Sequence, residues 1–146
     1  MTNIPADKAA VAPAELKTRI VVIDDEKRIA DTLALILRSK GYAAEVAYDG
    51  PSGLVTCSQF SPQLVITDVV MPRMSGIEVA IELRRQLPDC KVLLYSGQAA
   101  TAQMIEEARS RGHDFELLAK PIHPIQLLEK VQSVIGAPKT PVISQL

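Results

Sequence analysis

Acidic residues directly follow two short apolar runs of the sequence. Asp68 ends the run 64–67, and Asp24 and Asp25 follow the run 19–23. Uninterrupted apolar runs of this length are typical of strands that are buried on both faces, as in a parallel sheet. In open parallel sheets, ligands bind outside the carboxyl ends of the strands. We therefore expect these three carboxylates to meet at one edge of a sheet.

Two further polar residues end apolar runs in the same way. Ser96 follows the run 91–95, and Lys120 follows the run 115–119. Each residue alone has a simple structural explanation, because an aspartate can cap a helix, a serine can form a turn and a lysine can lie at the surface. Their joint occurrence at four strand ends favours a shared chemical site.

Three carboxylates that lie close together need a cation. Two unit charges about 4 Å apart, at an effective dielectric constant of about 20, interact by about 4 kcal/mol. Lys120 supplies one positive charge. Oxygen ligands around an open face suit Mg²⁺, which commonly combines carboxylates with water and substrate phosphate oxygens. The acidic cluster therefore indicates phosphoryl chemistry with Mg²⁺ as the cofactor.

Asp68 is the expected phosphoryl acceptor, because an aspartate carboxylate can form an aspartyl phosphate. Mg²⁺ and Lys120 would neutralise charge on the equatorial oxygens during in-line transfer. Ser96 would donate a hydrogen bond to a phosphoryl oxygen. These three residues are the predicted catalytic group.

The residues between the apolar runs predict five helices. Ser75 and Glu78 have the spacing of a capping box and predict the start of the third helix, which continues to about residue 87. The fourth helix, 99–111, has few large apolar residues, and we expect it to be the most easily displaced. Apolar residues expected to face the core from the first, second and last helices are Ile29, Leu33, Ile36, Leu37, Leu54, Val55, Phe60, Leu128, Val131 and Ile135.

Five strands alternating with five helices predict an α/β fold, namely a doubly wound (βα)5 flavodoxin-like three-layer sandwich. The strand at 44–48 shows partial alternation, as expected at a sheet edge, which favours the parallel order 2-1-3-4-5. The predicted domain covers 19–136. Residues 1–18 are expected to be a flexible leader and residues 137–146 a flexible tail.

Composition limits the possible partners and location. The 146 residues are 47% hydrophobic and 23% charged, which suits one domain with a substantial core, and the net charge of −1 gives no reason to expect direct nucleic acid or membrane binding. Cys57 and Cys90 lack metal-binding spacing, which is typical of reduced, packed thiols. No stretch has signal-peptide character or approaches the ~18 apolar residues of a membrane span, so we expect a cytoplasmic protein.

From about residue 19 to residue 136, the chain resembles the receiver domain of two-component response regulators. The matching residues are Asp24-Asp25, Asp68 with Met71-Pro72 and Gly76 after it, Ser96-Gly97, and Lys120-Pro121. The resemblance implies phosphoryl transfer to Asp68 from the phosphohistidine of a sensor histidine kinase or a histidine phosphotransfer protein. It also implies that Asp25, Asp68 and the Val70 backbone carbonyl hold Mg²⁺, and that Asp24 acts through water.

The same resemblance implies how the signal is passed on. In the family, the residue equivalent to Ser96 moves toward the phosphoryl group with the fourth helix, and the peptide bond equivalent to Lys120-Pro121 is often cis. A Tyr or Phe usually stands where this chain has Leu117, and the segment 112–115 is one residue longer than usual. Whether Phe115 substitutes for the missing aromatic residue is left open.

We expect a phosphorylation-dependent signalling switch that consists of the receiver alone, because about ten residues follow Gly136. It would control a downstream protein or relay phosphate, as a monomer or a homodimer, and it would catalyse no reaction beyond its own phosphorylation and dephosphorylation. One alternative is a phosphohydrolase of the haloacid dehalogenase type, which requires an aspartate where Val70 stands. The other is a receiver-fold interaction module that works without phosphorylation.

Val70 also bears on how long a phosphoryl group would stay on the protein. Its side chain cannot hydrogen-bond an attacking water, whereas that of Gln98 can. We hypothesise a persistent phosphorylated state.

Overall fold

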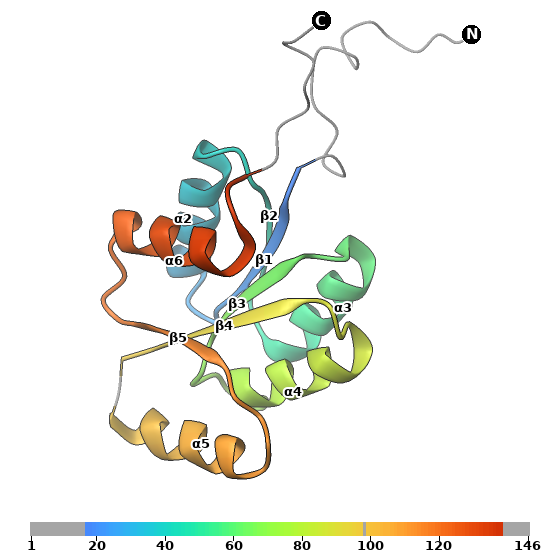
Figure 1. Ribbon diagram of the computed structural model, residues 1–146, viewed down its shortest axis with the longest axis vertical. Coiled ribbons are helices and arrows are strands. Elements are labelled where there is room, and N and C mark those ends of the chain that lie inside the picture. Colours follow the sequence, from blue (N-terminus) through green and yellow to red (C-terminus); the bar gives the residue numbers. More distant parts are fainter. Residues whose placement is uncertain (1–16, 98, 139–146) are drawn as a thin grey trace, which may run out of the picture.

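The computed structural model describes residues 17–97 and 99–138, which form a five-stranded parallel sheet between two layers of helices (Figure 1). The strands are β1 (Arg19–Ile23), β2 (Ala43–Ala47), β3 (Leu64–Asp68), β4 (Lys91–Ser96) and β5 (Glu116–Ala119). Their order is β2-β1-β3-β4-β5 and all four pairings are parallel, which confirms the predicted topology. Every residue of the central strand β3 is buried, whereas burial along the edge strand β2 is mixed.

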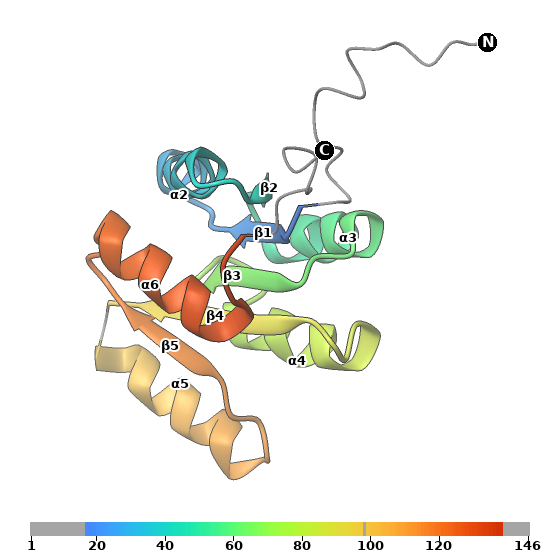
Figure 2. The same cartoon turned by 45° about the horizontal axis from the view of Figure 1, so that its top comes forward.

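Two helices cover one face of the sheet and three cover the other, as Figure 2 shows. The first pair is α2 (Lys27–Ser39) and α6 (Pro124–Ile135). The other three are α3 (Gly50–Phe60), α4 (Gly76–Gln86) and α5 (Ala99–Ser110). The three-layer, doubly wound sandwich predicted from the sequence is therefore confirmed.

The start of α4 is fixed by its cap and by a close approach to β3. The Ser75 hydroxyl accepts the Glu78 N–H at 3.1 Å, and the Glu78 carboxylate accepts the Ser75 N–H at 2.8 Å, so the predicted capping box is present. A Cβ on Gly76 would lie 1.9 Å from the carbonyl oxygen of Asp68. Only glycine therefore allows the helix to begin this close to the end of β3.

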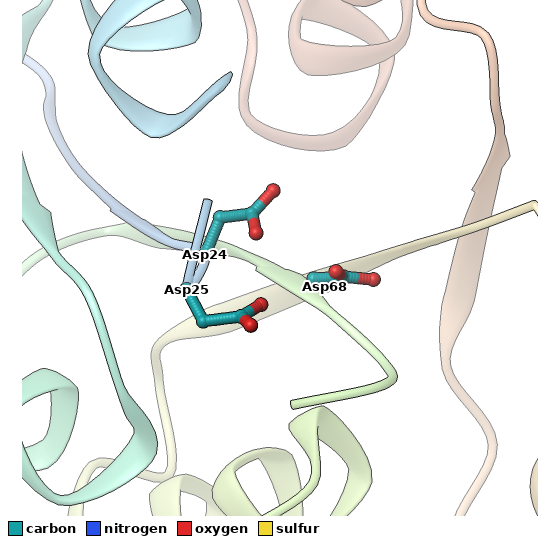
Figure 3. Close-up of side chains that lie close together, drawn as sticks. All are labelled: Asp24, Asp25 and Asp68. Atoms are coloured by element: carbon teal, nitrogen blue, oxygen red, sulfur yellow. The ribbon is translucent and has the colours of Figure 1, made fainter. Parts of the chain in front are cut away.

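The carboxyl ends of β1 and β3 lie side by side. Ile23 pairs with Thr67 in the parallel register, so the next residues along the two strands, Asp24 and Asp68, are neighbours at the same edge. Figure 3 shows these two side chains together with that of Asp25. The sheet therefore brings together acids that are more than forty positions apart in the sequence.

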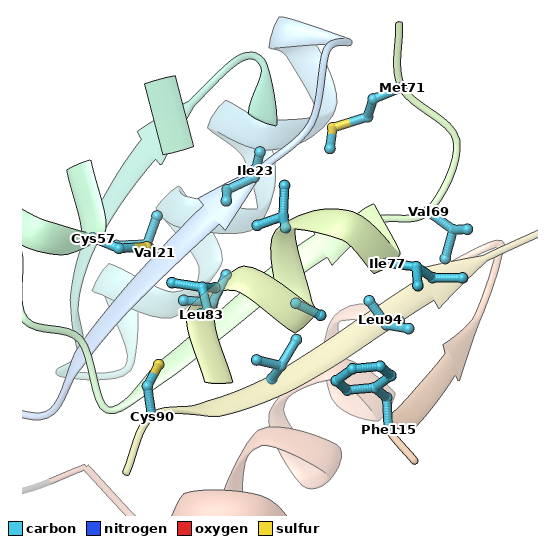
Figure 4. Packing of buried hydrophobic residues seen from close by; sticks show 14 of the residues in the cluster. Val21, Ile23, Cys57, Val69, Met71, Ile77, Leu83, Cys90, Leu94 and Phe115 are labelled. Atoms are coloured by element: carbon cyan, nitrogen blue, oxygen red, sulfur yellow. The ribbon is translucent and has the colours of Figure 1, made fainter. Parts of the chain in front are cut away.

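The core has one part on each face of the sheet, and Figure 4 shows the part under α3, α4 and α5. Cys57 and Cys90 are buried free thiols in this part, as the sequence predicted. The prediction that Val55 faces the core is wrong, because its side chain is 56% exposed. Leu54 and Phe60, the other residues expected from this helix, are partly buried against the cluster, and the fully buried residues of α3 are the small residues Gly50, Gly53 and Cys57. A Cβ on Gly53 would lie 2.4 Å from the Ile23 side chain, so the helix packs too closely on β1 for large side chains.

On the other face, the expected residues of α2 are confirmed. Leu33 and Leu37 are buried, and Ile29 and Ile36 are partly buried against the same cluster. In α6 the prediction is confirmed for Val131, and Leu127, which was not predicted, is buried with it. The buried pair is Leu127 and Val131, while Leu128 and Ile135 are partly buried at the margin of the cluster. The helix begins at Pro124, and Leu127 and Val131 lie on one face of it because they are four residues apart.

Most of the predicted leader (1–18) and tail (137–146) lies outside the described residues. The bounds of three strands differ by one residue from the prediction: β2 covers Ala43–Ala47, β4 includes Ser96 and β5 begins at Glu116. Within the part of the chain that the structure describes, no helix has the length and apolar character needed to cross a membrane.

Candidate functional site

Three carboxylates gather at the carboxyl edge of the sheet. One oxygen from each of Asp24, Asp25 and Asp68 lies within 4.8 Å of the others (Figure 3). Asp24 is fully buried and Asp68 is 6% exposed, whereas Asp25 is open to solvent. The arrangement has buried acids at its base and one exposed acid at its rim. A cation can reach it from solvent.

The Asp24 carboxylate is held by protein donors on both of its oxygens. Oδ1 accepts the backbone N–H of Glu26 at 2.9 Å, and Oδ2 accepts the hydroxyl of Tyr95. Burial raises the pKa of Asp24, and the hydrogen bonds from Tyr95 and Glu26 oppose that rise. Because both oxygens already have partners, a metal contact through water suits Asp24 better than direct ligation.

Lys120 lies against the central acid. Its Nζ is 3.2 Å from Oδ1 of Asp68, which is the contact that the strand ends predicted. Burial raises the pKa of Asp68, and the charge and hydrogen bond of Lys120 and the N–H groups of Val70 and Val69 oppose that rise. The Lys120-Pro121 peptide bond is cis, as the resemblance implied.

Ser96 reaches the same edge, but its hydroxyl contacts a helix. The register pairs Ser96 with Ala119, the residue before Lys120. The Ser96 hydroxyl is hydrogen-bonded to the hydroxyl of Thr101, a residue of α5 that is 2% exposed. The structure therefore brings the five predicted side chains to one edge and adds a contact from Ser96 to α5.

The family model of the response regulator receiver domain matches residues 20–132. This chain belongs to that family. Receiver domains are signalling modules of two-component systems rather than classical enzymes, and they generally bind Mg²⁺ at an acidic pocket. The resemblance identified from the sequence is confirmed.

Known receivers agree in sequence and in fold. The response regulator MprA of Mycobacterium tuberculosis (strain ATCC 25618 / H37Rv) is 27% identical over 124 residues, which are 85% of this chain and 53% of that protein. This receiver thus spans about half the length of the curated relatives it matches. Vibrio cholerae chemotaxis protein CheY4 superposes with a TM-score of 0.72 at 27% identity, over 81% of this chain and 98% of CheY4. A CheY-like receiver from Methanospirillum hungatei JF-1 gives a TM-score of 0.71 at 28% identity, over 80% of this chain and 91% of that one.

The acids of the receiver open into a groove of about 960 Å³. Asp25, Asp68 and Lys120 line its polar end. Its apolar wall comes from α2 and from the segment before α6. That wall consists of Ile29, Leu33, Ile36, Pro121, Ile122 and Pro124. Asp68 therefore lies at the polar end of an open groove.

The carboxylates of this receiver fit a magnesium ion. All the side-chain donors at the cluster are oxygens, and Asp25 is exposed at the rim. Mg²⁺ prefers oxygen ligands and keeps several waters, which an open, solvent-facing cluster permits. The fit rests on the donor set and its access to solvent.

Leu117 stands at the position of the family's usual aromatic residue but carries no ring. Its side chain is 40% exposed, and it pairs with Leu94, two residues before Ser96. Phe115 lies further away, because it precedes Glu116, which pairs with Leu93. Each residue along a strand adds about 3.3 Å. Phe115 is buried beneath α4 and α5 at the other end of the strand, so it does not substitute at the site.

Sequence reasoning missed Tyr95 and Thr101. Tyr95 ends the apolar run 91–95 and there indicates only a buried strand residue. Thr101 is a neutral residue near the start of a helix with few apolar side chains. A hydroxyl at the end of an apolar strand, next to acids on the neighbouring strands, was the available signal for Tyr95.

Proposed function

We propose that this receiver accepts a phosphoryl group on Asp68 from the phosphohistidine of a sensor histidine kinase or a histidine phosphotransfer protein. A carboxylate oxygen of Asp68 forms a bond to phosphorus as the phosphorus–nitrogen bond of the donor breaks, and the imidazole nitrogen keeps the bonding electrons. The 3.2 Å contact between Lys120 Nζ and Asp68 carries this proposal, because it places a positive charge where the incoming group brings negative charge.

Asp25, Asp68 and the backbone carbonyl of Val70 would hold Mg²⁺, with Asp24 acting through water. When bound, the ion supplies positive charge that offsets the carboxylates and the phosphoryl oxygens. Asp68 would serve both as ligand and as acceptor. Lys120 stays beside it and would pair with the phosphoryl group.

Ser96 would report phosphorylation to α5. In the structure its hydroxyl is bonded to Thr101, so a hydrogen bond to a phosphoryl oxygen requires Ser96 to leave that partner. Among the described side chains of α5, residues 101–110, only Thr101, Ile105 and Ala108 are buried, and Met104 is partly buried, so few large side chains fix this helix. The loss of this hydrogen bond would loosen a helix that few large side chains fix, and the resulting movement would change the surface that a downstream protein reads.

The proposed output is control of a protein partner or onward relay of the phosphoryl group, by a monomer or a homodimer. The apolar wall of the groove, next to Asp68, suits a phosphohistidine donor that is itself a protein. The buried, free thiols of Cys57 and Cys90 suit the reducing cytoplasm. We propose no direct contact with nucleic acid or membrane.

The test is phosphorylation of the full chain by acetyl phosphate with and without Mg²⁺, read by intact mass. We expect the mass of one phosphoryl group to be added in the presence of Mg²⁺, and we expect Asp68→Asn to remain unmodified. Asp89→Asn, which changes an exposed loop acid, is the control and should behave as the wild type. Absence of modification, with no structural response to beryllofluoride, would favour an interaction module that works without phosphorylation. If Asp68 is phosphorylated, transfer from purified histidine kinases would identify the donor.

A further inference from the structure

We propose that Tyr95 is a positioning residue that holds the buried carboxylate of Asp24 and thereby sets the affinity of the receiver for Mg²⁺. The inference rests on the proposed function, because it assumes that the acidic cluster is the magnesium site. It adds a residue from the core of the sheet to that site.

Tyr95 is buried completely, yet its polar end is at the site. It belongs to the core cluster between the sheet and the helices α2 and α6, and its hydroxyl reaches Asp24, 71 positions away in the sequence. A buried hydroxyl needs a hydrogen-bond partner, and a charged partner makes the stronger bond. The ring packs in the core, and its hydroxyl orients the carboxylate of Asp24.

The two donors on Asp24 fix the orientation of its carboxylate. Glu26 N–H binds Oδ1 at 2.9 Å and Tyr95 binds Oδ2, so rotation of the carboxylate breaks at least one bond. Removal of the Tyr95 hydroxyl leaves the backbone contact alone. Partners that orient metal-binding groups in this way typically contribute 10- to 100-fold to metal affinity.

The ring of Tyr95 also faces the lysine of the site. Lys120 Nζ lies 5.0 Å from the ring centroid and 3.2 Å from Asp68. This distance permits a cation–π contact. Tyr95→Phe keeps the ring and removes only the hydroxyl, so the substitution isolates the contact with Asp24 and leaves the Lys120 contact in place.

A matched control lies in the same cluster. Tyr42 is 1% exposed, and its hydroxyl donates to the carbonyl oxygen of Gly136 at 3.2 Å, away from the acids. Tyr42→Phe therefore removes the hydroxyl of an equally buried side chain that has no link to the site. A purely structural role for the Tyr95 hydroxyl predicts that both variants lose stability and keep the wild-type affinity for Mg²⁺.

The experiment titrates Mg²⁺ into the metal-free full chain by calorimetry, for the wild type, Tyr95→Phe and Tyr42→Phe. We expect the Kd of Tyr95→Phe to rise about 10-fold, in line with other residues that orient metal ligands, and that of Tyr42→Phe to remain unchanged. Phosphorylation by acetyl phosphate gives a second readout. Tyr95→Phe should need more Mg²⁺ for half-maximal rate but should reach nearly the wild-type rate at saturation.

A Kd for Tyr95→Phe within twofold of the wild type would overturn the inference and leave the proposed function intact. Wild-type protein that binds no Mg²⁺ would overturn both, so the two failures are distinguishable. A double-mutant cycle adds a further check. If Tyr95 acts through Asp24, then Tyr95→Phe has no additional effect on the Kd in an Asp24→Asn background. An equal effect in both backgrounds would contradict the proposal.

Discussion

The hydroxyl of Ser96 at the end of β4 is hydrogen-bonded to the hydroxyl of Thr101 in α5. This contact links the sheet edge that carries the acids to α5. Few large side chains of α5 are buried in the core. The usual aromatic residue of the family is replaced by Leu117 in this chain. The Ser96–Thr101 pair therefore offers a direct connection between the site and α5.

Thr101→Val should shift the receiver toward its phosphorylated conformation. The valine keeps the shape of the side chain but gives up the hydrogen bond that holds Ser96, which is worth about 1 kcal/mol. We expect beryllofluoride to bind roughly fivefold more tightly in the presence of Mg²⁺. Thr101→Ser keeps a hydroxyl and is the control. Equal affinity of Thr101→Val and the wild type would show that Ser96 is not restrained by this contact.

Lys120→Ala should slow phosphorylation of Asp68 by about 100-fold, because it removes a positive charge that the structure places 3.2 Å from the acceptor. The rate is measured with acetyl phosphate at saturating Mg²⁺. Lys130→Ala is the matched control, since Lys130 pairs at 2.8 Å with Glu116, the first residue of β5, and not with the acidic cluster. A loss of rate in both variants would point to general destabilisation.

The stability of the metal-free protein should respond to pH through Asp68. Burial raises the pKa of Asp68 above that of an unfolded aspartate, about 3.9. A raised folded-state pKa contributes stability that is complete below the unfolded value and is lost as pH rises through the folded value. Asp68→Asn should therefore become more stable than the wild type as pH rises from about 4 to 7, as measured by urea denaturation without Mg²⁺.

Asp49 provides a control, because its contribution to stability should change with pH in the opposite direction to that of Asp68. Hydrogen bonds from Ser52 lower the pKa of Asp49, so its contribution to stability is present above the unfolded value and is lost as pH falls through the folded value. Asp49→Asn should be less stable than the wild type at pH 7, and the difference should vanish in acid. The same trend for both variants would contradict the assignment for Asp68.

The two cysteines should be unreactive in the native protein. Burial raises the pKa of Cys57 to about 12 and that of Cys90 to about 11. The thiolate is the form that iodoacetamide attacks, so at pH 8 we expect no alkylation of the folded chain and two alkylations in guanidinium, read by intact mass. Fast alkylation of the folded chain would show that this part of the core opens readily.

Val70→Asn should shorten the life of the phosphorylated state. Val70 is 46% exposed beside the groove, and its side chain cannot hydrogen-bond an attacking water. An asparagine can, and we expect hydrolysis about 10-fold faster, equal to about 1.4 kcal/mol in the barrier. A wild-type half-life of seconds would refute the hypothesis of a persistent phosphorylated state. Gln98, the other residue in that hypothesis, lies outside the described residues.

Local patterns predicted the elements well where one physical signal dominated. The apolar runs before Asp24 and Asp68 identified strands buried on both faces, and the Ser75–Glu78 spacing identified the start of α4. The prediction failed where packing distance decided the outcome. Val55 is apolar but exposed, because the face of α3 that packs on β1 is that of Gly50, Gly53 and Cys57.

The sequence by itself determined the alternation of strands and helices and the presence of acids, a hydroxyl and a lysine at the strand ends, because periodicity and chain order are local properties. Only the tertiary structure decided the partners of those groups. The bonds from Tyr95 to Asp24 and from Ser96 to Thr101 depend on the register of neighbouring strands and on the seating of α5. No spacing in the chain encodes these contacts, since they form only when the packed elements fix the distances between side chains.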